Sequence, residues 1–141
     1  MQRKKRRNCL LHIKHSKGVQ DDMAINSKNK GKVGENELVH FLKDLGFECH
    51  RSQQFKGDTS GDDDADVVGI PFIHIECKRN EKLNVENALQ QAERDNSKED
   101  VIPVVMWRKN RETWKATLRL DKFMEVFRVY MEERQKKDEK S

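Results

Sequence analysis

Two short runs rich in β-branched residues, at positions 66–70 and 72–78, constrain the fold of this chain most. Each has the composition of a strand, and the Gly-Ile-Pro turn between them predicts an antiparallel hairpin. Strand residues alternate between the faces of a sheet, so one face of the second run carries Phe72, His74, Glu76 and Lys78, and the other carries Ile73, Ile75 and Cys77. The hairpin therefore predicts Asp66 beside Glu76 or Lys78.

This cluster has the residue types of a metal site that acts on phosphate. Magnesium prefers hard oxygen ligands and takes one or two carboxylates with waters and substrate phosphate oxygens, which Asp66 and Glu76 would supply. Lys78 would hold or activate the attacking water and offset negative charge in the transition state. The alternative is a solvated strand face, because a spacing of this kind also occurs by chance.

The composition of the whole chain excludes several classes of protein. Its 141 residues predict one domain with a real core. No apolar run approaches roughly 18 residues, and no signal-peptide pattern follows the charged N-terminus, so we expect a soluble, cytoplasmic protein without a membrane partner. The three cysteines are widely spaced and predict neither a disulfide framework nor a structural zinc site, and Cys9-x-x-His12-x-x-His15 fits no standard zinc spacing. Asp58, Asp62, Asp63 and Asp64 lack the full pattern of a calcium loop.

Positive charge is concentrated at the N-terminus. Residues 1–32 carry ten Lys or Arg against two Asp, whereas the remaining residues carry 19 basic against 23 acidic side chains. We predict a basic, disordered arm at 1–30, a folded domain at 31–132 and a charged tail at 133–141 that frays. The arm would neutralise nucleic-acid phosphates or serve as a solubilising tail. A further alternative is that the first 22 residues are an over-extended gene start, because Met23-Ala24-Ile25-Asn26 resembles an ordinary protein start.

The remaining elements follow from periodicity and turn residues. We predict an α-β-β-β-α-β-β-α order, and Gly46 should end the first helix. Pro103 should lie near the start of its strand or on an edge. In chain order, the elements flanking the hairpin are a helix at 33–45, a strand at 47–51, a polar loop at 53–64, a helix around 85–92, strands at 102–107 and 114–120, and a last helix around 123–130.

Two polar residues face the apolar sides of their helices. Glu35 continues the stripe formed by residues three, four and seven positions on, whereas Glu37 faces the more polar side of the same helix. An inward carboxylate needs a partner, which would be a metal, a metal-bound water or Lys78; the alternative is a first-turn Glu favoured by the helix dipole. Gln91 flanks the apolar face of its helix, while Gln90 points nearer to solvent.

The order of elements, with an acid in the first helix, Asp66 at the second strand and Glu-x-Lys in the third, resembles the PD-(D/E)xK nuclease superfamily. The segments Gly31-Lys32-Val33-Gly34-Glu35-Asn36-Glu37-Leu38, Gly46-Phe47, Arg51-Ser52 and Ile75-Glu76-Cys77-Lys78 are similar to archaeal-type Holliday junction resolvases and related phage nucleases. The resemblance covers residues 31–120. It implies a restriction-endonuclease-like α/β fold, a mixed sheet flanked by helices.

The resemblance also implies roles for single residues. Glu35, Asp66 and Glu76 would be the metal-binding acids, Lys78 the catalytic lysine and Gln91 the glutamine that several branches carry. The backbone carbonyl of Cys77 would be a further metal ligand. Asp64 competes with Asp66 for the ligand role, and Ser60 is the candidate for a serine that family resolvases carry in a mobile loop.

We therefore expect a Mg²⁺-dependent DNA endonuclease, with Mn²⁺ substituting, that has no small-molecule substrate. The resemblance implies a homodimer acting on branched DNA in a bacterial or phage-infected cell. Alternatives are a phage replication, repair or restriction nuclease acting on flap or linear DNA, and a non-catalytic DNA-binding module of the same fold. The residues expected to contact DNA are Arg51, Lys56, Ser60, Arg79, Arg108, Lys109 and Arg111.

Overall fold

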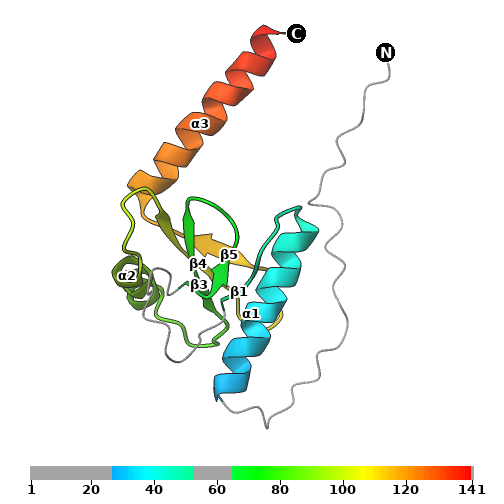
Figure 1. Cartoon of the computed structure of the whole chain (residues 1–141), viewed down its shortest axis with the longest axis vertical. Helices are drawn as coiled ribbons and strands as arrows, with labels where there is room; N and C mark the ends of the chain where they lie inside the picture. Colours follow the sequence, from blue (N-terminus) through cyan, green and yellow to red (C-terminus); the bar gives the residue numbers. More distant parts are fainter. Residues whose placement is uncertain (1–26, 53–64, 141) are drawn as a thin grey trace.

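The computed structural model describes residues 27–52 and 65–140 and contains a five-stranded mixed sheet with three helices (Figure 1). The order of elements confirms the predicted α/β fold. The elements are α1 Ser27–Asp44, β1 His50–Arg51, β2 Val67–Val68, β3 Ile73–Lys78, α2 Val85–Asp95, β4 Ile102–Trp107, β5 Lys115–Thr117 and α3 Leu120–Glu139.

The strands lie in the order β1-β2-β3-β4-β5, with one parallel pair at the centre. β1, β2 and β3 pair antiparallel, β3 and β4 are parallel, and β5 returns antiparallel beside β4. Pro103 lies near the start of β4, before the segment that pairs with β5. The Ile102 N–H donates to the Phe72 carbonyl, next to β3. The following residue, Pro103, would direct its missing N–H to the opposite side of β4, at a position where β5 does not pair, so no sheet hydrogen bond is lost.

The two faces of β3 pack against different helices. Ile75 lies in a buried cluster with Leu38, Val39 and Leu42 of α1, whereas α2 packs Ala88, Leu89 and Ala92 against Val105 of β4. Figure 1 shows α1 and α2 on opposite sides of the sheet. Glu76 pairs in register with Val105 and therefore belongs to the α2 face, while Cys77 lies on the α1 face.

The end of α1 follows the predicted glycine chemistry. Gly46 has a φ of +97°, and the Phe47 N–H donates to the Leu42 carbonyl at 3.0 Å, as in a Schellman cap. The start of the helix differs from the prediction, because α1 begins at Ser27 rather than near Val33. Lysine side chains lose little rotamer freedom in a helix, so the polar approach continues the helix despite Gly31.

The hairpin between β2 and β3 is wider than predicted. Phe72 does not extend the strand face; it lies in the turn with a φ of +67° and is 73% exposed. Its carbonyl instead accepts from the Ile102 N–H, which ties the turn to β4. β1 and β2 are also shorter than the predicted strands at 47–51 and 66–70, and a two-residue ladder pairs them.

Helix α3 differs most from its prediction. It continues through the charged residues to Glu139, where the sequence predicts a fraying tail, and none of its residues is buried. In Figure 1 it extends away from the sheet and from the other two helices. Within the described part of the chain, no helix combines the length and apolar composition needed to cross a bilayer.

Candidate active site

Asp66 meets β3 at the point where the short ladder with β2 ends. The Asp66 N–H donates to the Ile75 carbonyl at 2.9 Å, and the Asp66 carboxylate accepts from the Cys77 N–H at 2.8 Å. The N–H and C=O of a strand residue point to the same side, so the Cys77 carbonyl also faces Asp66. The turn predicted Asp66 beside Glu76 or Lys78; the hydrogen bonds of Asp66 are instead to Ile75 and Cys77, and the charges of Glu76 and Lys78 lie close enough to affect its pKa.

Glu76, Lys78 and Gln91 form a connected group on the α2 face. The Lys78 ammonium lies 2.7 Å from a carboxylate oxygen of Glu76 and donates to the Gln91 side-chain oxygen at 3.2 Å. The Glu76 side chain is only 3% exposed, whereas Lys78 is 23% exposed. Gln90 points outward and donates to Glu86, so the helical phase of α2 selects Gln91 as the partner of Lys78.

In the candidate site, the carboxylates outnumber the positively charged side chains. Burial, with the nearby charges of Glu76 and Glu35, raises the pKa of Asp66 to about 6, although the Cys77 N–H and Lys78 act to lower it. Burial also raises the pKa of Glu76, against the stabilising bond from Lys78. Burial and the same carboxylates raise the pKa of the Cys77 thiol, which keeps it protonated and unreactive.

Glu35 approaches the site from α1. Its carboxylate accepts from the Arg51 guanidinium at 2.7 Å, and its charge contributes to the raised pKa values of both Asp66 and Glu76. The inward position predicted from the helix stripe is therefore correct, since Leu38, Val39 and Leu42 beside it are buried. Its direct partner is an arginine of β1, which the sequence argument did not identify.

A second carboxylate of α1, Glu37, is a residue that sequence reasoning missed. One of its oxygens accepts from Arg108 at 2.7 Å and 3.1 Å and from Arg79 at 3.4 Å. Arg108 also lies over the Trp114 ring, 5.7 Å from its centroid. The three residues come from α1, the segment after β3 and the segment after β4, so only the fold reveals the cluster. The signal available in the sequence was the Glu-x-Glu spacing that starts at Glu35.

The donor set fits a hard divalent cation. Asp66, Glu76 and the Cys77 carbonyl supply oxygen atoms, and the raised carboxyl pKa values indicate a site that a further positive charge would stabilise. Across residues 27–52 and 65–140, no three side chains of the His, Cys, Asp and Glu types form a metal-binding group. Glu35 is instead paired with Arg51.

The remaining candidates are distributed around this centre. Arg51, Arg79 and Arg108 are held by the two α1 carboxylates. Lys109 and Arg111 lie in the connection between β4 and β5, where Arg111 has a φ of +63°. Lys56, Ser60 and Asp64 lie outside the described residues, as does the basic arm before residue 27.

A mixed sheet with an acid-x-lysine strand at its centre is the architecture of a PD-(D/E)xK nuclease. The family described as "Phage putative PDDEXK endonuclease" matches residues 26–140, and the chain belongs to that family. The predicted superfamily is thereby confirmed. Comparison with curated proteins and with solved structures gave no match. Nucleases of this type act on DNA and typically use a divalent metal.

Proposed function

We propose that this protein is a Mg²⁺-dependent endonuclease that hydrolyses phosphodiester bonds in DNA, with Mn²⁺ able to substitute. The observation that carries the proposal is the convergence of Asp66, Glu76 and Lys78 at one end of the β2–β3 ladder. Family membership supports the reaction class, and the donor set supports a hard metal ion.

Asp66, Glu76 and the Cys77 carbonyl would hold the ion, which supplies Lewis-acid charge and a water of lowered pKa. Lys78 would position the attacking water and balance charge as it develops on the phosphate. Gln91 would fix the Lys78 ammonium, because its side-chain oxygen accepts one of the lysine's hydrogen bonds. Glu35 would act through a water or through its charge, since Arg51 occupies its carboxylate. Asp64 remains the candidate that would share the ligand role.

The DNA-contacting residues we propose have a net positive charge despite their internal pairing. Arg79 and Arg108 share the carboxylate of Glu37, and Arg79 also lies 3.9 Å from a carboxylate oxygen of Glu81, so the net positive charge of this surface comes from the other basic residues. Arg51, Lys109 and Arg111 extend this surface on both sides, with Lys56 and Ser60 in the adjoining loop. Such contacts position the backbone without reading sequence, so binding should weaken steeply with salt.

We propose a branched DNA substrate cut by a two-fold dimer, on the basis of the resemblance to junction resolvases. Helix α3 supports the dimer, because a helix without any buried residue exposes a stripe that includes Phe123, Phe127 and Tyr130. Residues 120–140 carry six acidic and six basic side chains, a balance that suits a second copy better than a nucleic acid. The second candidate, cleavage of flap or linear DNA in phage replication or restriction, rests on the phage family assignment.

The proposal is tested on labelled four-way junction, fork, flap, linear duplex and single strand, with Mg²⁺ and with EDTA. We expect cleavage only with the metal, and paired symmetric nicks if the junction is the substrate. Glu76→Gln, Asp66→Asn and Lys78→Ala should each lower the cleavage rate by at least about 100-fold, because each removes a group acting on the transition state, while DNA binding persists. Wild-type cleavage by Glu76→Gln would refute the site. If the wild-type protein binds DNA but does not cleave it with any metal ion tested, a non-catalytic DNA-binding module would be favoured.

A further inference from the structure

A polar groove of about 450 Å³ lies beside Lys78 and Gln91 and is lined by the segment before α2 and by α2 as far as Arg94. Three cations line it, Lys78, Lys82 and Arg94, together with five Asn or Gln side chains. Among the described residues, no carboxylate and no aromatic ring belongs to its lining. The groove therefore has net positive charge and many hydrogen-bond donors, and it opens directly beside the candidate catalytic lysine.

The chemistry of the lining selects the kind of ligand. Unpaired bases are usually held by stacking on aromatic side chains, which this groove lacks. Lysine, arginine and amide N–H groups are instead the usual donors to phosphate and sugar oxygens. Gln91 accepts from Lys78 through its oxygen, so its amide N–H groups remain available as donors toward the groove.

We infer that this groove binds the sugar–phosphate backbone of the DNA strand next to the scissile phosphate, with Lys82 and Arg94 as phosphate contacts. The inference rests on the proposed nuclease function, because it takes Lys78 as the point where the strand is cut. The volume is within the range of about 300–1,000 Å³ typical of ligand sites, enough for a short segment of one strand. The amide side chains of Asn80 and Asn87 would complete the contacts along the strand.

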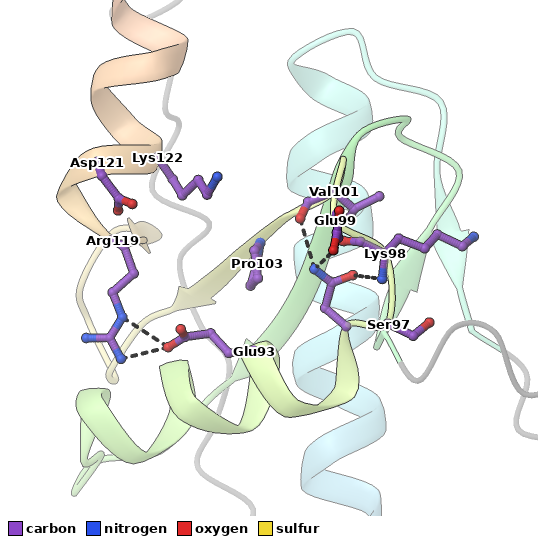
Figure 2. A pocket seen from close by; sticks show the side chains of 10 residues that line it. Glu93, Ser97, Lys98, Glu99, Val101, Pro103, Arg119, Asp121 and Lys122 are labelled. Atoms are coloured by element: carbon purple, nitrogen blue, oxygen red, sulfur yellow. Dashed lines mark hydrogen bonds and ion pairs between the residues drawn. The ribbon is translucent and has the colours of Figure 1, made fainter.

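A second pocket has a lining without the net positive charge that a phosphate backbone requires. It lies between the end of α2, the segment that follows α2 and the start of α3, with a volume of about 340 Å³ (Figure 2). Its cations are matched by the carboxylates of Glu93, Glu99 and Asp121. Arg119 donates to Glu93 at 2.7 Å and to Glu86 at 2.9 Å, so its charge is already compensated. This pocket therefore has no net positive charge to attract a phosphate backbone, and it supplies matched control positions.

The test compares two double variants that each lose two positive charges. Lys82→Ala/Arg94→Ala changes the groove, and Lys98→Ala/Lys122→Ala changes the charge-balanced pocket. Binding of labelled DNA is measured in EDTA, so that no cleavage occurs, over a series of salt concentrations. We expect the groove variant to bind roughly tenfold more weakly per lost phosphate contact near 0.1 M salt and to lose about two from the slope of log K against log salt. The control variant should keep the wild-type slope.

Two further measurements make the assignment specific. Removing the bases from the flanking strand should leave the effect of the groove variant unchanged, because the proposed contacts are to the backbone; a lost effect would overturn this assignment. Equal slopes for the two double variants, with both folded by circular dichroism, would overturn the groove itself. If the wild-type protein cuts no DNA with any metal, the nuclease proposal fails, whereas a selective binding loss would still support a backbone groove.

Discussion

At the scale of single residues, the site concentrates carboxylates that the protein only partly compensates. Asp66 has a pKa of about 6 where an ordinary Asp has 3.8, mainly because it is buried and lies near Glu76. A carboxyl whose pKa is higher in the folded state stabilises the fold below its unfolded pKa, and this stabilisation is lost as the pH rises through about 6. The ionised Asp66 should therefore lower the free energy of unfolding of the metal-free protein at neutral pH.

We predict that Asp66→Asn raises the free energy of unfolding of the metal-free protein at pH 8 by up to about 3 kcal/mol, because about two pKa units are worth roughly that amount. The asparagine oxygen can still accept from the Cys77 N–H, so the local geometry persists. Urea unfolding in EDTA measures the effect, and the gain should shrink toward pH 4. A variant less stable than the wild-type protein at pH 8 would contradict this account.

The same variant separates metal binding from folding. Added Mg²⁺ should stabilise the wild-type protein, because the ion binds only the folded state, and should stabilise Asp66→Asn much less. Equal stabilisation of the two proteins by Mg²⁺ would show that Asp66 holds no metal.

At the scale of elements, the sequence predicted those features that depend on strand alternation and helical periodicity. The alternation in β3 correctly placed Glu76 opposite the Ile75 core, and the helical phase of α2 correctly distinguished Gln91 from Gln90. The phase of α1 was wrong for Glu37, whose side chain is 24% exposed, close to the 20% of Glu35. The cluster of Glu37, Arg79 and Arg108 could not be predicted, because its partners are 42 and 71 positions apart from Glu37. The geometry of the turn could not be predicted from strand alternation either, because Phe72 lies in the turn and not in β3.

The packing of α1 against the segment after β3 depends on one glycine. A Cβ at Gly34 would lie 2.8 Å from the Cβ of Arg79, closer than two carbon atoms can approach. Glycine inside a helix normally costs about 1 kcal/mol relative to alanine, so an alanine here would otherwise be favourable. Gly31 lies in the same helix, and a Cβ there would meet no atom within 4 Å.

We predict that Gly34→Ala lowers the free energy of unfolding by about 1–3 kcal/mol, because the overpacking outweighs the gain in helix propensity. Gly31→Ala is the matched control and should raise it by roughly 0.5–1 kcal/mol. Chemical denaturation of the two variants measures both values. Stabilisation by both alanines would mean that α1 and Arg79 can separate without cost.

At the scale of the whole molecule, α3 touches the rest of the described chain near its start, and none of its residues is buried. Its large apolar side chains recur three and four positions apart, and the Phe127 ring stacks with both Phe123 and Tyr130 at 5.9 Å between centroids. Most of the stability of a helix in a protein comes from the packing of its apolar face, so the apolar face of this 20-residue helix needs a surface to cover it. A two-fold partner presents the same stripe and the same balanced charges, which makes the contact self-complementary.

We predict that Phe123→Glu/Phe127→Glu converts a dimer into monomers, because each substitution places a charge in the apolar contact and a buried unpaired charge is costly. Arg128→Ala is the control, since it changes the net charge yet lies outside the stripe by helical spacing and should leave the dimer intact. Sedimentation velocity over a concentration series measures the state of each protein. If monomers of the double variant still nick DNA but no longer cut junction strands in symmetric pairs, the two active sites act together through α3. A wild-type protein that stays monomeric at all concentrations would refute the dimer, and the exposed stripe would then have to be covered by a different macromolecule.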